Sequence, residues 1–262
     1  MSLMPFRREL LLTACAKDDE QELERLLGQS SSDAEERGRE LAELLCACAS
    51  GHAECVRLLL ASGAAADAVD EDGETPLYTA CAKGHPECVR LIINGGASVD
   101  APDKNGTSPL QVACGEGHAE CARLLIGANA MTDPAAVNGT TPIHAACYGG
   151  ELECVRLLVA AGACTNPPAM NGATPLHAAC SKGHTECARV LVEGGAAPSQ
   201  QRSDGASPLY TAAEQGHAEC MRLLIVAGAV VDLPDEDGDT PLYVAVSHGH
   251  AKAVRWRAPL TG

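Results

Sequence analysis

Apolar positions along this chain recur in pairs of short amphipathic segments separated by polar loops. One such segment begins at Thr174, which proline follows directly, and the segment ends at Gly183. Threonine caps a helix start, proline suits the first helical position, and glycine suits the left-handed end, so this segment predicts a short helix. Cys187 and Leu191 then share one face at i, i+4 spacing, which predicts a second helix over residues 186–192.

The same pattern returns every 33 residues without insertion or deletion. Its clearest mark is a hydroxyl residue followed by proline, at Thr75-Pro76, Ser108-Pro109, Thr141-Pro142, Thr174-Pro175, Ser207-Pro208 and Thr240-Pro241. A fixed period of this length indicates stacked structural units that bury their apolar faces against their neighbours. The chain is therefore predicted to be a solenoid, an architecture suited to binding.

Charge and hydropathy narrow the classes of partner and compartment. The formal net charge is −16, whereas nucleic acids and anionic membranes attract basic surfaces. Residues 1–12 lack the continuous apolar run of a signal peptide, and no apolar stretch reaches the length of a membrane span. We expect no nucleic acid or membrane partner, and a cytoplasmic or nuclear location.

The 14 cysteines follow the repeat and do not suggest a disulfide framework. Two series keep the 33-residue spacing: Cys15, Cys48, Cys81, Cys114, Cys147 and Cys180, and then Cys55, Cys88, Cys121, Cys154, Cys187 and Cys220. Only Cys46 and Cys164 fall outside them. Each series is interpreted as a small buried apolar position, and so many free thiols indicate a reducing compartment.

The compound pattern Thr-Pro-Leu-His-Ala-Ala at 174–179, Gly-His at 183–184, Val-Leu-Val at 190–192 and Gly-Ala at 195–196 closely resembles the ankyrin repeat. The resemblance covers residues 42–254. It implies an all-α solenoid of stacked helix-turn-helix units with short β-hairpin loops. It also implies a concave face, built from loop tips and first helices, on which ankyrin proteins bind protein partners.

Both ends depart from the pattern. Residues 1–41 are predicted to be an N-terminal capping unit and a polar linker, with the linker over residues 28–39. Residues 255–262 are an off-pattern tail, after a last half repeat that Trp256 would cap. Within the array, we expect Leu157 to be buried.

The resemblance places candidate partner-binding residues on the loop tips and on the exposed side of the first helices. The tips offer Lys104, Asn105, Val137, Asn138, Met170 and Asn171, and the helices offer Glu116, Tyr148, Lys182 and Gln215, with Lys83 at the same position. Tyr148 and Met170 rank first because exposed aromatic and thioether groups tend to be anchors. Acidic tips at residues 70–74 and 235–239 favour a protein partner with basic character.

No pattern of catalytic or metal-binding residues emerges. Six histidines follow glycine at the inter-helix turn, and six copies of one active site are implausible, so a structural role is predicted. His144 and His177 are expected to tie helix starts to adjacent loops. Cysteine pairs spaced by seven residues lack the CxxC knuckle of zinc sites. We therefore expect no metal, no cofactor and no catalysis.

One modification site is predicted. Asn166 stands where other repeats carry Asp67, Asp100, Asp133, Ser199 and Asp232, and asparagine in that setting can be β-hydroxylated in ankyrin proteins. The function expected is a monomeric, non-catalytic scaffold or adaptor that binds a protein on the concave face. Two alternatives stay open: a substrate-recognition subunit of a ubiquitin ligase, because the cysteine-rich units resemble some such ankyrin proteins, and a regulatory fragment of a larger enzyme.

Overall fold

Helices occur in pairs along the chain, as the apolar pattern predicts. The computed structural model describes residues 13–14, 21–22, 25 and 34–254. Contacts divide the chain into two units, one of Met1–Ala113 with His118–Met131 and one of Cys114–Gly117 with Thr132–Gly262. Each unit is described by itself below.

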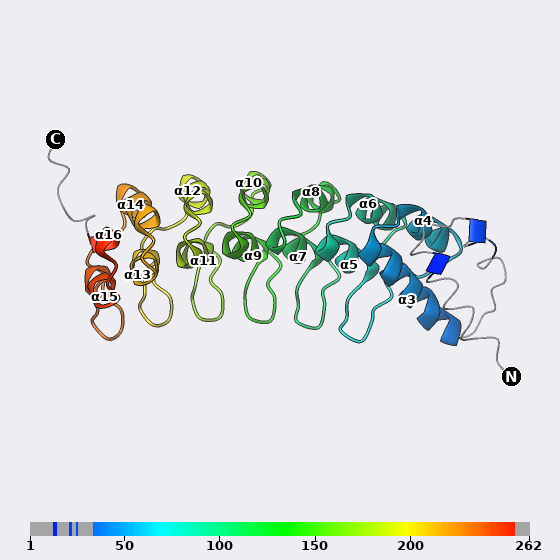
Figure 1. Ribbon diagram of the computed structural model, residues 1–262, viewed down its shortest axis with the longest axis horizontal. Helices are drawn as coiled ribbons and strands as arrows, with labels where there is room; N and C mark the ends of the chain where they lie inside the picture. The colour runs from blue at the N-terminus through cyan, green and yellow to red at the C-terminus, as the bar shows by residue number, and fades with distance from the viewer. Residues whose placement is uncertain (1–12, 15–20, 23–24, 26–33, 255–262) are drawn as a thin grey trace. The chain divides into compact units, whose positions relative to one another are not determined.

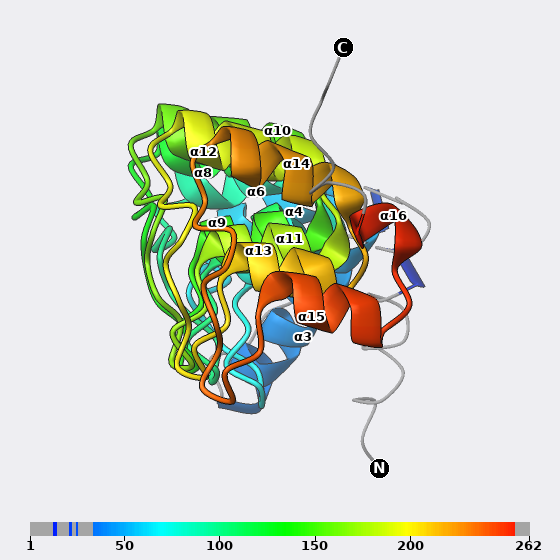
Figure 2. The same cartoon turned by 90° about the vertical axis from the view of Figure 1, so that its left-hand side faces the viewer.

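The first unit contains α3 (Ala34–Ser50), α4 (Ala53–Ala61), α5 (Pro76–Lys83), α6 (Pro86–Asn94), α7 (Pro109–Gly115, whose last two residues belong to the second unit) and α8 (Ala119–Gly127). The second contains α9 (Pro142–Gly149), α10 (Leu152–Ala160), α11 (Pro175–Lys182), α12 (Thr185–Glu193), α13 (Pro208–Glu214), α14 (Ala218–Val226), α15 (Pro241–Ser247) and α16 (Ala251–Val254). In the second unit the first helices α9, α11, α13 and α15 form one row, and α10, α12 and α14 form another (Figure 1). The loops that precede the first helices project together from the first row (Figure 2). The all-α stacked architecture is thus confirmed.

Helix starts and ends use the predicted chemistry. Thr75 has extended backbone, and its Oγ1 accepts a hydrogen bond from the Tyr78 N–H at 3.1 Å. Gly84 and Gly183 close α5 and α11 in the left-handed conformation, with φ of 71° and 75°. A positive φ is inexpensive only for glycine, so these residues define where each first helix stops.

The core of each repeat is a layer of aliphatic residues and cysteines. Each helix from α3 to α13 has one large side chain that is fully buried, and this set comprises Leu44, Leu59, Leu77, Ile92, Leu110, Leu125, Ile143, Leu158, Leu176, Leu191 and Leu209. The expectation that Leu157 is buried was wrong in degree: Leu157 is half-buried, and Leu158 is the core residue of α10. Adjacent leucines point to different faces of a helix, and only one of them faces the neighbouring repeats.

Loops are fastened to their neighbours by main-chain and side-chain hydrogen bonds. The Asp103 N–H donates to the Thr107 carbonyl at 3.0 Å, which closes a tight turn, and the Lys104 N–H reaches the preceding loop at the Asp72 carbonyl at 3.0 Å. These turns take the place of the expected short hairpins; the described residues include no β-strand.

A second link joins consecutive loops 31 residues apart. A side-chain oxygen accepts from a backbone N–H at 2.8–3.0 Å in each of five pairs: Asp67 with Ser98, Asp100 with Met131, Asp133 with Cys164, Asn166 with Ala197, and Ser199 with Val230. This position of each loop therefore favours a short side chain with an acceptor oxygen.

The N-terminal part differs from the sequence expectation. Residues 34–39, predicted as polar linker, form the start of α3, which continues to Ser50. The apolar positions Leu44, Ala47 and Cys48 are buried in this helix, so the first helix of this repeat is longer than the others at its polar end. The first part of the linker, Cys15 and the expected Trp256 cap lie outside the described residues.

Candidate functional site

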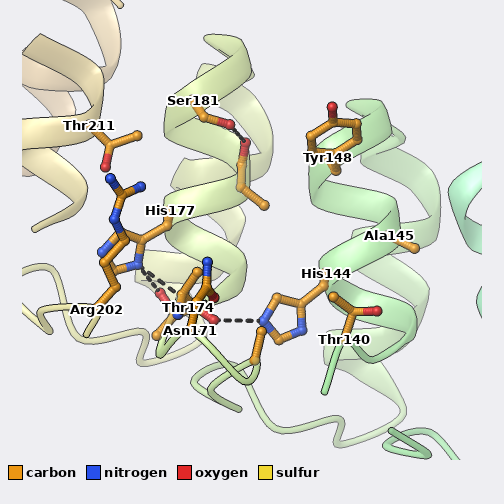
Figure 3. A pocket seen from close by; sticks show the side chains of 13 residues that line it. Thr140, His144, Ala145, Tyr148, Asn171, Thr174, His177, Ser181, Arg202 and Thr211 are labelled. Atoms are coloured by element: carbon orange, nitrogen blue, oxygen red, sulfur yellow. Dashed lines mark hydrogen bonds between the residues drawn. The ribbon is translucent and has the colours of Figure 1, made fainter. Parts of the chain in front are cut away.

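The second unit carries a groove on its row of first helices, between α9 and α11 (Figure 3). Its volume is about 380 Å³. Alanines and hydroxyl residues form much of its wall, because short side chains at these first-helix positions leave space between consecutive repeats. The lining residues are Thr140, His144, Ala145, Tyr148, Ala169, Asn171, Ala173, Thr174, His177, Ala178, Ser181, Arg202 and Thr211.

Two buried histidines fix the geometry of the groove floor. The Thr174 N–H donates to His177 Nδ1 at 3.1 Å, and Nε2 of the same ring lies 3.0 Å from the Ala206 carbonyl of the next loop. His144 makes the equivalent bonds, from the Thr141 N–H at 3.2 Å and with the Ala173 carbonyl at 3.1 Å. An N–H donor at Nδ1 and a carbonyl at Nε2 define the neutral tautomer with its proton on Nε2.

Burial also keeps these rings neutral. It lowers the pKa of His144, and it lowers the pKa of His177 to about 4, more strongly than the bond to the Ala206 carbonyl raises it. Both ring nitrogens are engaged, so neither ring has an edge for proton transfer to a ligand. The predicted role of both residues, tying helix starts to adjacent loops, is confirmed.

Tyr148 and Lys182 meet at the outer edge of the groove. The Lys182 Nζ lies 4.4 Å from the centroid of the Tyr148 ring, in a cation–π contact between α9 and α11. The Tyr148 side chain is nevertheless 58% exposed. An exposed aromatic ring held in place by a neighbour is a prepared contact surface, since little rotamer freedom is left to lose on binding.

Arg202 and Thr211 form the other end of the groove. Nε of Arg202 bonds both carboxylate oxygens of Asp204, at 2.7 and 2.9 Å, which lowers the pKa of that carboxyl. Thr211 is only 2% exposed, yet its Oγ1 has no hydrogen-bond partner. The hydroxyl of Thr79, at the equivalent position of α5, instead donates to the Thr75 carbonyl at 3.2 Å.

The structure brings together some of the sequence-predicted site residues. Tyr148 and Asn171 line the groove, and Lys182 lies over Tyr148. Val137 and Met170 are among the most exposed apolar side chains, at 72% and 78%, but lie on loop tips. The others are exposed away from the lining of the groove: Lys104, Asn105, Glu116, Asn138 and Gln215.

Arg202 and Thr211 were missed by sequence reasoning. Arg202 lies in a polar loop where nothing distinguishes it from its neighbours Gln201 and Ser203. Thr211 did carry a signal, because most repeats have alanine or valine at its position, as at Ala145 and Ala178. A hydroxyl at a small apolar position requires an explanation, and comparison of the repeats with one another could have revealed it.

The turn histidines are structural, as predicted, but their series has a break. Nε2 of His85 lies 3.2 Å from the Ala49 carbonyl, and the ring covers Gly51 of the preceding repeat. His250 makes the same contact with the Glu214 carbonyl at 2.9 Å. At the fourth such turn the sequence has Glu151, whose carboxylate lies over Gly117.

The cysteines lie where the repeat pattern puts small apolar residues. Both series are buried within the described residues, whereas Cys46 is half-buried and Cys164 exposed. Burial raises the pKa of Cys81 and Cys147 well above the ordinary value, which makes these thiols poor nucleophiles. Among the described residues no group of three or more His, Cys, Asp or Glu side chains is arranged to hold a metal ion.

Asn166 takes part in the link between loops. Its Oδ1 accepts from the Ala197 N–H at 2.8 Å, and its Nδ2 donates to the Gly195 carbonyl at 3.2 Å. Asparagine therefore makes the acceptor bond that aspartate makes in other repeats and adds a donor bond. The side chain is half-buried.

Paired helices at a fixed period, glycine-closed first helices and projecting loops define a helical repeat protein. The family model for ankyrin repeats (3 copies) matches residues 44–133, 127–202 and 194–256, and the chain belongs to the ankyrin repeat family. Ankyrin repeats are interaction modules, in general non-catalytic, that bind protein partners.

One solved structure with a similar fold is the human ASB11 ankyrin repeat domain. It superposes with a TM-score of 0.76 at 28% sequence identity, covering 84% of this chain and 99% of that domain. The search of curated proteins found no match. None of the described helices combines the length and the apolar character required to cross a membrane.

Proposed function

We propose that this protein is a non-catalytic scaffold or adaptor that holds a segment of a protein partner in the groove between α9 and α11. The observation that carries the proposal is the exposed Tyr148 ring, held by Lys182 beside a hollow lined by small side chains. Aromatic side chains at the edge of a pocket are typical binding anchors. The Thr-His bonds fix the groove before a partner arrives, which reduces the entropy lost on binding.

The acidic loop tips are proposed to attract a basic region of the partner. The first carboxylate of each acidic tip holds the loop itself, because Asp70 Oδ1 accepts from two backbone N–H groups at 2.9 Å, and Asp235 Oδ1 accepts from two at 2.8 and 3.1 Å. The exposed acids beside them, Glu71 and Asp72 in one unit and Glu236 and Asp237 in the other, are free to attract a basic region. Such steering weakens with salt.

The experiment compares two tyrosines of equal exposure. Tyr148 and Tyr243 are both 58% exposed on first helices, but Tyr243 does not line the groove. Three variants would each carry one photo-crosslinking amino acid, at position 148, at position 243 or at Val226 of the second-helix row. Each variant would then be irradiated in reduced lysate. Adducts would be identified by mass spectrometry.

The expected result is a protein adduct at position 148 that disappears when Met170→Ala or Lys182→Ala is added, with little adduct at 226. Tyr148→Ala should abolish capture of that protein, and Tyr243→Ala should preserve it. Equal labelling at 148 and 226, or equal capture by both alanine variants, would refute the groove as the binding surface.

The same data separate the two alternatives. A substrate-recognition subunit of a ubiquitin ligase should also capture ligase components through another surface, so their recovery should survive Tyr148→Ala. A regulatory fragment should capture or inhibit an enzyme through the groove. The proposed cytoplasmic or nuclear location and monomeric state would be checked by imaging a tagged chain and by light scattering.

A further inference from the structure

We infer that the groove recognises an acidic side chain of an extended peptide segment, with an apolar neighbour of that side chain against Tyr148. This inference rests on the proposed function and names the chemistry of the segment bound. It starts from the hydrogen-bonding atoms that the groove leaves unused.

Two side chains of the groove, Asn171 and Arg202, keep N–H donors for a ligand. The two histidines have both ring nitrogens engaged, and the Ser181 hydroxyl donates to the Ala178 carbonyl at 2.9 Å. Asn171 uses its Oδ1 to accept from the Ala173 N–H at 3.1 Å, which leaves its NH₂ group for a ligand. An amide NH₂ has two donors and no acceptor.

The cationic side chains of the site, Arg202 and Lys182, are also hydrogen-bond donors. Asp204 occupies the Nε edge of Arg202, so the outer guanidinium nitrogens remain for a ligand, and Figure 3 shows that end of the side chain directed toward Thr211. Lys182 contacts an aromatic ring through its ammonium group. Ammonium and guanidinium groups only donate, and carboxylate is the side-chain group that only accepts.

Thr211 adds an independent indication of a ligand. A hydroxyl without a partner is costly on a side chain that is only 2% exposed, yet this one lines the groove. Thr79 satisfies its own helix in the same repeat position, so the free hydroxyl is particular to this site and not a property of the repeat. A ligand oxygen beside Arg202 would satisfy it.

The charge of the groove lining differs from the acidic character of the chain as a whole. The chain has 35 acidic and 19 basic residues, but none of the thirteen residues lining the groove carries a carboxylate. Asp204 and Glu214 are the carboxylates whose charges act on Arg202, and both lie outside the lining. An acidic segment is thus repelled by the acidic tips and not by the lining of the groove, which favours specificity.

The test uses random linear peptides displayed on phage with no free C-terminus, selected on the wild-type chain. The expected result is enrichment of Asp or Glu next to an apolar residue. Enrichment of Lys or Arg, indifference to charge, or no enrichment would each overturn the inference. Recognition of a C-terminal carboxylate alone would appear in this library as no enrichment and would overturn the inference as well.

A selected peptide would then be measured by fluorescence anisotropy beside its copy with the acid replaced by the amide. Loss of the charge should weaken binding about tenfold or more on the wild-type chain. Thr211→Val should weaken the acidic peptide by about tenfold and the amide peptide much less, because the hydroxyl and the acid are coupled. Lys182→Gln, at the other end of the groove beside Tyr148, should weaken both peptides by similar factors. Equal losses for both peptides on Thr211→Val would contradict a carboxylate contact.

Matched controls come from the equivalent positions of the first unit. Lys83 and Thr79 occupy the positions of Lys182 and Thr211 in α5, so Lys83→Gln and Thr79→Val should leave binding unchanged. Thr211→Val should not lower the melting temperature, since it removes an unpartnered hydroxyl. If the natural partner crosslinks at position 148 but peptide selection shows no acid, the groove stands as the binding surface and only its proposed chemistry fails.

Discussion

Acidification should destabilise the groove through the His177 imidazole. The ring is 2% exposed, and burial lowers its pKa from 6.5 to about 4. The unfolded chain therefore binds more protons than the folded chain between these values, so stability is present above pH 6.5 and lost as the pH falls toward 4. With these two pKa values, linkage gives a loss of about 2 kcal/mol between pH 7 and pH 5.

His177→Gln isolates this contribution. Glutamine occupies the same repeat position naturally at Gln111, where its N–H bonds the capping Ser108 Oγ at 3.1 Å. At pH 7 the variant should be less stable by about 1–3 kcal/mol, because the ring hydrogen bonds are lost. Its further loss on going to pH 5 should be smaller than that of the wild type by about 2 kcal/mol.

The assay is urea unfolding at pH 7 and pH 5, followed by circular dichroism. Titration of surface carboxylates and of His144 affects both proteins, so the difference between their pH responses reports His177. Arg202, which lowers the pKa of the ring, and Asp204, which raises it, are retained in both. An equal pH response of the two proteins would refute the buried, neutral imidazole.

Three other perturbations test the packing of the repeats. Leu158→Ala should cost about 2–5 kcal/mol in urea unfolding and Leu157→Ala clearly less, since only Leu158 is fully buried; equal costs would reject that assignment. Gly183→Ala should lower the melting temperature more than Gly195→Ala. Both glycines have positive φ, but only a methyl at position 183 would lie 2.6 Å from an imidazole of the next repeat. Similar shifts for the two variants would mean that this contact is relieved at no cost. Peptide mass mapping should show a gain of about 16 Da at Asn166 after incubation with an asparaginyl hydroxylase. The Asn166→Asp variant should keep the acceptor bond and lose the modification. An unmodified wild-type peptide would disprove the predicted site.

The regular part of the fold could be predicted from the sequence because each signal acts locally. Thr174 caps the next residues, and Gly183 supplies a backbone conformation within its own turn. Repetition then multiplies a weak local signal into a reliable one. The role of His177 could also be predicted, because the same capping position recurs in other repeats.

Features that depend on contacts between repeats were harder to predict. Leu157 and Leu158 are chemically identical, and only the direction of the neighbouring helix decides which one is buried. The start of α3 at Ala34 depends on an apolar face that begins only at Leu41, beyond a strongly polar segment. Arg202 lines the groove together with Thr211 of α13, and no property of residues 199–203 indicates this.

The links between consecutive loops have a consequence for how this chain can change over evolution. Asp133, Asn166 and Ser199 make the same bond from the same repeat position, although their side chains differ in charge and size. Because every link joins equivalent positions of neighbouring repeats, deletion or duplication of a whole repeat leaves each donor facing an acceptor. Recombination between repeats can therefore lengthen, shorten or shuffle the proposed binding surface while the hydrogen bonds that hold the loops remain matched.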